Sequence, residues 1–121
     1  MFSKITEFSP EVSASLWKSS SYVRSRISLM STTPLVSILI NNYNYANYVP
    51  NAISTALGQS YDRIEVIVVD DGSRDESRDV ISGFSDRVKA VFKQNGGQGS
   101  AFNAGFAASQ GDIICFLDAD D

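Results

Sequence analysis

Three aspartates close the chain and give the first indication of chemistry. Asp118, Asp120 and Asp121 come at the end of an apolar run, IICFL (113–117). Carboxylates this close together repel one another unless a cation lies among them. In an extended segment the side chains of Asp118 and Asp120 point to the same face, so their carboxylates converge. Such oxygen ligands suit Mg²⁺ or Mn²⁺, and these ions also bridge to phosphates. A solvated acidic end or a helix start is the alternative interpretation of so short a motif.

Other polar residues that could bind a ligand follow the earlier apolar runs. Asp70 and Asp71 come after IEVIVV (64–69), and an ionised Asp71 can accept hydrogen bonds from a nucleobase or a sugar. Tyr43 can stack on a base through its ring face, although packing within its loop explains it equally well. The glycine-rich NGGQG (95–99) offers backbone N–H groups to a ligand, or is a plain loop. It is not a P-loop, because no Lys-Ser or Lys-Thr follows it.

Composition narrows the class of protein. The 121 residues allow one domain, and the hydrophobic fraction of 43% is that of a globular core. A net charge of −4 and a pI near 4.6 argue against a nucleic-acid-binding surface. The sequence has no histidine, which excludes Ser-His-Asp and Cys-His catalysis and His-ligated zinc. The single cysteine, Cys115, forms no intramolecular disulfide and no apolar run approaches the length of a membrane span, so we expect a cytoplasmic protein.

Residues 1–33 differ from the rest of the chain, because they are rich in serine. Apolar residues recur there at roughly helical spacing, with basic residues nearby: Val12, Leu16, Val23, Ile27 and Met30, and Lys18, Arg24 and Arg26. One interpretation is a basic amphipathic helix that rests on the inner face of a membrane or on a partner. The other is a poorly ordered tail, which the composition favours because serine is a weak helix former. Met30 is also a candidate for the true start of the protein.

From residue 34 onward, apolar runs alternate with amphipathic segments. Strands are predicted at four apolar runs: 35–40, 64–69, 88–93 and 112–117. Three of these runs are apolar on both faces, as in strands that helices cover on both sides. Strands alternating with helices predict an α/β fold with a Rossmann-like parallel sheet and right-handed crossovers. Ligands bind such sheets outside the carboxyl ends of the strands, and all the polar clusters described above lie on that rim.

Three helices are predicted between the strands. The first begins near Pro50 and weakens at Gly58. The second is expected to begin with a capping box, in which Ser73 caps the helix and Glu76 lies three residues further on. The third covers residues 100–110. Each of these helices would serve as the crossover between two parallel strands.

Residues 34–121 resemble the amino-terminal, donor-binding half of an inverting glycosyltransferase of family two, which has the GT-A fold. The resemblance is carried by four signals in the family's order and spacing: the YN after the first strand, the VVDDGS turn, the NGG…NAG segment and the closing D-x-D. It implies a partial GT-A fold over residues 34–121. It also implies a nucleotide-diphosphate sugar as the donor, with a UDP-sugar as the first expectation.

The resemblance also implies roles for particular residues. Asn41 and Tyr43 would hold the nucleobase, and Asp71 would bond to it. Asp118 would lie beside the ribose, and Asp118 and Asp120 would hold a divalent cation, Mn²⁺ or Mg²⁺, on the diphosphate. That cation would neutralise the charge that develops on the leaving diphosphate. Many family members carry an arginine just before NAG, and this chain departs from them with a phenylalanine at position 102.

The family's remaining parts limit what this chain is expected to do. In the family the general base and the acceptor site come after the D-x-D, so no residue here is assigned as the base and the acceptor is unknown. The last strand lacks polar alternation and is expected beside the first strand, buried on both faces. We therefore predict the donor-binding half of a longer enzyme, with a non-catalytic nucleotide-binding remnant as the alternative. A phospho-acceptor signalling domain is disfavoured, because no aspartate follows the third strand.

Overall fold

The structure is a computed structural model, which describes residues 33–120. A four-stranded sheet forms its centre. Its strands are β1 (Val36–Asn42), β2 (Ile64–Asp71), β3 (Lys89–Lys93) and β4 (Ile113–Asp118). They lie in the order β3-β2-β1-β4, and each pair of neighbours is parallel. The predicted α/β fold is confirmed. The interpretations offered for the serine-rich segment fall, except for Thr33, outside the described residues, as does Asp121.

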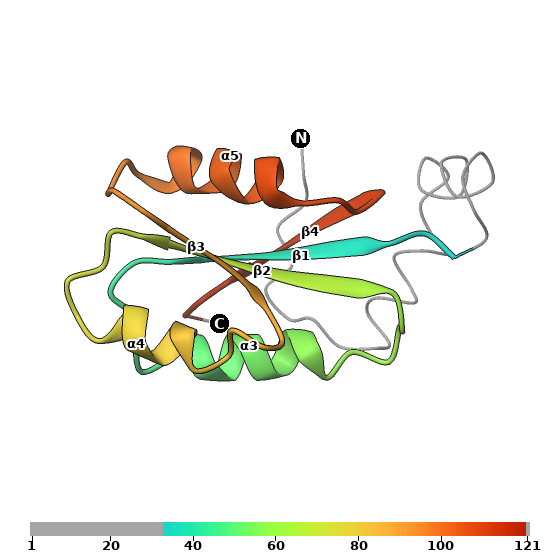
Figure 1. Ribbon diagram of the computed structural model, residues 1–121, viewed down its shortest axis with the longest axis horizontal. Coiled ribbons are helices and arrows are strands. Elements are labelled where there is room, and N and C mark those ends of the chain that lie inside the picture. The colour runs from blue at the N-terminus through green and yellow to red at the C-terminus, as the bar shows by residue number, and fades with distance from the viewer. Residues whose placement is uncertain (1–32, 121) are drawn as a thin grey trace.

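Helices cover both faces of the sheet, as Figure 1 shows. On one face lie α3 (Val49–Leu57) and α4 (Ser77–Ser82), and on the other lies α5 (Gln98–Ala108). Because strand residues alternate between faces, β1 and β2 contribute to two apolar cores. The core under α3 and α4 includes Ile38, Ile40, Val66, Val68, Ile53 and Ile81, and the core under α5 includes Leu39, Ile67, Val69 and Ala101. Among residues 33–120, no helix is long and apolar enough to cross a membrane.

The register of the strands brings their carboxyl ends to one rim. Asn42 at the end of β1 is paired with Asp70 on β2, and Asn41 is paired with Asp118 on β4. Asp71 is paired in turn with Lys93, the last residue of β3. Polar residues that are distant in the sequence therefore lie side by side at the edge where parallel sheets bind ligands.

The predicted capping box is wrong. Helix α4 begins at Ser77, with Glu76 as its N-cap residue, and Ser73 lies outside the helix. The hydroxyl of Ser73 donates instead to Asp70 Oδ1 at 2.6 Å, and its backbone N–H donates to Asp70 Oδ2 at 3.1 Å. The same hydroxyl accepts the N–H of Asn44 at 2.8 Å. Ser73 therefore closes the turn between β2 and α4 and fastens it to the loop after β1.

Strand β4 lies beside β1 as expected, but it is less buried than its sequence predicts. Only Leu117 in this strand is buried, and the other residues are half-buried, because β1 is the only strand paired with β4 among the described residues. On the α5 side, Phe116 packs edge to face against Phe102, with ring centroids 4.5 Å apart. Burial raises the pKa of the Cys115 thiol to about 11, so it is a poor nucleophile at neutral pH.

Helix α5 lies close to the sheet because small residues face it. Ala101 and Gly105, one turn apart, are its buried residues. A Cβ at Gly105 would lie 3.0 Å from Leu39 Cδ2 and 3.1 Å from Val69 Cγ2. These distances are shorter than ordinary van der Waals contact, so the missing side chain sets how closely the helix approaches β1 and β2.

We expect Gly105→Ala to destabilise the protein by about 1–3 kcal/mol, the usual cost of overpacking a core. Gly99→Ala in the same helix is the matched control, because a Cβ there would meet nothing within 4 Å. Alanine is the better helix former, so this control should be neutral or stabilising by up to about 1 kcal/mol. Urea denaturation of both variants measures the two effects. A destabilisation of equal size in both variants would contradict the close approach of α5.

Candidate functional site

One pocket on the rim gathers every site residue predicted from the sequence. It is open, has a volume of about 570 Å³ and lies outside the carboxyl ends of β1, β2 and β4. We call it the acidic pocket, because its lining includes three carboxylates and no basic side chain among the described residues. The predicted residues in its lining are Asn41, Tyr43, Asp71, Asp118 and Asp120. Its other lining residues include Asn42, Tyr45 and Asn95, for which no individual role was predicted.

Asp118 and Asp120 line this pocket from a strand end and a turn. Strand β4 ends at Asp118, and Ala119 and Asp120 form a turn, so the expected extended geometry is wrong at this point. Ala119 is buried and Asp120 is exposed. Asp118 and Asp120 nevertheless both line the acidic pocket. Asn41, paired with Asp118 across the sheet, has a buried side-chain oxygen without a hydrogen-bond partner in residues 33–120.

These oxygen atoms fit a small hard cation that a ligand helps to hold. Two carboxylates and the Asn41 amide oxygen are the kind of donor that Mg²⁺ and Mn²⁺ prefer. Within residues 33–120, no three acidic, cysteine or histidine side chains lie close enough to form a metal site of their own. A cation at this place would therefore need ligand phosphates to complete its coordination, which is the usual manner of Mg²⁺ binding.

Asp71 is buried and its carboxylate is already hydrogen-bonded on both oxygens. Oδ1 accepts Lys93 Nζ at 2.8 Å and the Gly96 N–H at 3.0 Å. Oδ2 accepts the Gly97 N–H at 2.9 Å and Asn95 Nδ2 at 3.3 Å. A carboxylate has about four acceptor positions, so this one is saturated. Two of the glycine N–H groups that the sequence offers to a ligand, those of Gly96 and Gly97, are thus bound to Asp71.

Asp70 is the functional neighbour that sequence reasoning left without a role. It is 2% exposed and points to the opposite face of β2 from Asp71, since successive strand residues alternate. Besides its two bonds to Ser73, it accepts Asn42 Nδ2 at 2.9 Å. Two adjacent aspartates at a strand end must face opposite sides. That pattern could have indicated that one carboxylate serves the turn while the other serves the rim.

The loop after β1 presents tyrosine rings at the mouth of the acidic pocket. Tyr43 and Tyr45 both line it, and each is 41% exposed. Tyr45 also meets Tyr48 edge to face, with centroids 5.9 Å apart. The loop is held in place by Asn44, whose backbone has a φ of 59° and whose Oδ1 accepts the N–H of Arg74 at 2.7 Å. A ring with this much exposure at a fixed loop is accessible for stacking.

Because it accepts these hydrogen bonds, the ionised Asp71 side chain stabilises the folded state. Burial alone would raise the pKa of Asp71, but the Lys93 ammonium and the N–H groups of Gly96 and Gly97 outweigh it and hold the pKa below its usual value. A lowered pKa means that the folded state favours the ionised form. Its contribution to stability is therefore present above the unfolded-state pKa of about 4 and is lost as the pH falls through the lowered value.

We expect Asp71→Asn to destabilise the protein at pH 7 by about 2–3 kcal/mol. This is less than for a fully buried ion pair, because the Lys93 side chain is 20% exposed. The difference between the variant and the unmodified chain should shrink as the pH falls below about 4. Asp75, whose pKa is also lowered despite its burial, is present in both proteins and cancels in the comparison. Chemical denaturation from pH 7 to pH 3 measures the effect, and a difference that stays constant over that range would contradict it.

Known relatives of this chain are glycosyltransferases. An uncharacterized glycosyltransferase of Nostoc sp. (strain PCC 7120) is 52% identical over 90 residues, which are 71% of this chain and 28% of that protein. The putative glycosyltransferase EpsH of Bacillus subtilis is 37% identical over 92 residues, which are 74% of this chain and 27% of EpsH. The chain thus spans little more than a quarter of the length of these relatives.

Solved structures share the fold. S. aureus TarS (residues 1–349) in complex with UDP-GlcNAc is 25% identical, with a TM-score of 0.63 over 71% of this chain and 26% of TarS. The mannosyltransferase PcManGT from Pyrobaculum calidifontis, in complex with GDP-Man and Mn²⁺, is 23% identical, with a TM-score of 0.64 over 72% of this chain and 28% of that enzyme. The family model described as glycosyl transferase family 2 matches residues 37–121. The chain therefore belongs to glycosyl transferase family 2.

Proposed function

We propose that this chain forms the donor site of a glycosyltransferase, where it binds a nucleotide-diphosphate sugar together with Mn²⁺ or Mg²⁺. The observation that carries the proposal is that five residues from three separate segments line one pocket at the strand ends: Asn41, Tyr43, Asp71, Asp118 and Asp120. The complex of TarS with UDP-GlcNAc supports a nucleotide sugar, and a UDP-sugar is the first candidate for this chain.

The diphosphate belongs at the β4 end of the acidic pocket. Asp118 and Asp120 would hold the cation there. When bound, the cation would neutralise charge on the leaving diphosphate. Without a cation, the two carboxylates would repel the phosphates, so these side chains make donor binding depend on the metal.

The nucleobase belongs at the ends of β1 and β2. Tyr43 would supply a ring face for stacking, and Asn41 would supply a polar contact beside it. An N–H of the base can bond to Asp71 only by displacing one of its present donors. Asn95 is the donor most easily displaced, because its bond of 3.3 Å to Oδ2 is the longest of the four and it also donates to the Asp71 backbone carbonyl. The two glycine N–H groups are fixed by the backbone.

The acceptor and the general base are not assigned in this chain. Transfer therefore requires parts of a longer protein, in which residues 34–121 would serve as the nucleotide-sugar-binding half. A non-catalytic remnant of this nucleotide-binding half is the second candidate. Donor binding distinguishes an intact site from a remnant that has lost it.

We expect UDP-GlcNAc to bind in calorimetric titrations only when Mn²⁺ is present. Asp120→Asn and Asp118→Asn should each weaken that binding about tenfold or more, because each removes a charged ligand of the cation. Asp86→Asn is the matched control, since this aspartate is exposed, pairs within residues 33–120 only with the neighbouring Arg87 and lies outside the pocket lining. Binding that is indifferent to Mn²⁺, or an equal loss in the control, would refute the metal site. Absence of binding with both UDP-GlcNAc and GDP-Man would favour the remnant.

We expect Tyr43→Ala to weaken donor binding by about 1–3 kcal/mol, the range for one base stacked on an aromatic ring. Tyr43→Phe should retain most of the affinity, because the ring face is kept. Tyr48→Ala is the control, since Tyr48 is more exposed than Tyr43 and lies outside the pocket lining. Isothermal titration of the three variants with the same nucleotide sugar measures the effect. If Tyr43→Ala binds as tightly as Tyr48→Ala, the ring does not stack on the base.

A further inference from the structure

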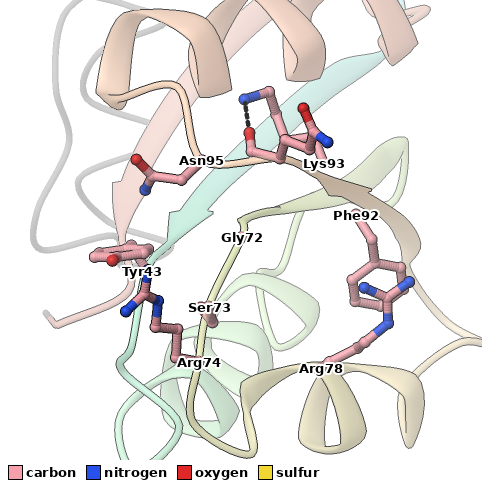
Figure 2. A pocket seen from close by; sticks show the side chains of 9 residues that line it. Tyr43, Gly72, Ser73, Arg74, Arg78, Phe92, Lys93 and Asn95 are labelled. Atoms are coloured by element: carbon pink, nitrogen blue, oxygen red, sulfur yellow. Dashed lines mark hydrogen bonds between the residues drawn. The ribbon is translucent and has the colours of Figure 1, made fainter.

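A second pocket lies on the same rim, between the β2–α4 turn and the end of β3 (Figure 2). It has a volume of about 560 Å³ and shares Tyr43 and Asn95 with the acidic pocket. We call it the basic pocket, because the charged side chains in its lining are Arg74, Arg78 and Lys93 and, within the described residues, none is acidic. A chain with a net charge of −4 thus gathers three basic side chains around one hollow.

The two arginines approach the basic pocket from opposite sides. Figure 2 shows Arg78 beside Phe92 on one side, and Arg74 pointing toward Tyr43 on the other. The Arg78 guanidinium lies 4.5 Å from the centre of the Phe92 ring, so a cation–π contact fixes its orientation. Stacking uses the face of the guanidinium and leaves the N–H groups on its edge able to donate.

Neither arginine forms an ion pair with a carboxylate within residues 33–120. Two other basic side chains, Lys93 and Arg87, each form one. Lys93 is paired with Asp71 at 2.8 Å, so this lysine adds little net charge to the pocket. Arg87 makes the same kind of ring contact as Arg78, over Phe84 at 5.1 Å, but it lies 3.8 Å from Asp86. The basic pocket therefore holds about two uncompensated positive charges, from Arg74 and Arg78.

We propose that the basic pocket is a second anion site, which binds a phosphate monoester between Arg74 and Arg78. A phosphate monoester carries a charge of about −1.5 to −2 at pH 7, which matches the two arginines. Guanidinium groups donate paired hydrogen bonds to phosphate oxygens. Arg74 and Arg78 are both exposed, so these long side chains can turn toward one phosphate from opposite sides of the pocket.

This phosphate is distinct from the diphosphate of the donor. Asp118 ends β4 and Lys93 ends β3, and these are the two outer strands of the described sheet. Three spacings of about 4.8 Å separate the outer strands, which amounts to about 14 Å. A diphosphate held by Asp118 and Asp120 does not reach Arg78. The inference does not rest on the proposed donor site, and it holds for a chain that binds no nucleotide sugar.

The test is a titration of the ¹⁵N-labelled chain with inorganic phosphate, followed by NMR at the arginine Nε–Hε signals. The signals of Arg74 and Arg78 should shift and saturate together, while the signal of Arg87 should not. The double variant Arg74→Gln/Arg78→Gln should bind phosphate about tenfold or more weakly, and Arg87→Gln should bind it unchanged. Backbone amide spectra check that the variants are folded. Arg74→Lys/Arg78→Lys, which keeps the charge, should recover part of the affinity.

Two results would overturn the site. Shifts that rise linearly and equally at Arg74, Arg78 and Arg87 would show general charge screening. Competitive displacement of phosphate by UDP with Mn²⁺ would show that the basic pocket is part of the donor site.

Vesicles of phosphatidic acid in phosphatidylcholine identify the source of the phosphate. Sedimentation with these vesicles that is lost in the double Gln variant assigns a lipid headgroup, and saturable binding of inorganic phosphate alone assigns a soluble ligand.

Discussion

Two consecutive carboxylates at the end of β2 hold the whole rim together. Asp70 and Asp71 are both almost fully buried, and burial of two adjacent charges would be costly if either lacked donors. Asp70 accepts three hydrogen bonds, from Asn42 and from the backbone and hydroxyl of Ser73. Asp71 accepts four, from Lys93 at the end of β3 and from Asn95, Gly96 and Gly97 directly after it. One strand end therefore positions the loops after β1, β2 and β3 at once.

Much of the fold and the gathering of the candidate site follow from the sequence, because both depend on rules that local patterns reveal. Apolar runs fix the strands, and parallel strands must bring their carboxyl ends to one edge. Asn41 and Asp118 are far apart in the chain and adjacent in the sheet for this reason. The hydrogen-bond partners of Asp71 could not be predicted in this way. Lys93 is 22 residues away, and no local pattern shows that its ammonium and two glycine N–H groups fill the carboxylate.

Where prediction failed, a contact from a distant or competing group replaced the one expected locally. Ser73 has the right spacing to Glu76 for a capping box, but the nearer carboxylate of Asp70 takes its hydroxyl, and the helix begins later. Phe102 stands where many family members have an arginine. Here its ring packs against Phe116 and so joins α5 to β4. The position therefore serves packing in this chain, and the basic side chains of the rim lie instead on the β2–α4 segment and β3.

The strand order explains how acidic and basic side chains coexist on one rim. Asp118 and Asp120 lie at β4, and Arg78 stacks on Phe92 of β3, at the other end of the sheet. A separation of about 14 Å exceeds the screening length of about 8–10 Å in physiological salt, so these opposite charges do not neutralise one another. Where β2 and β3 meet, Lys93 and Asp71 are adjacent, and there they do form an ion pair. The same sheet geometry that pairs charges on neighbouring strands thus keeps Asp118 and Asp120 apart from Arg78. We propose a cation at the acidic end and an anion at the basic end.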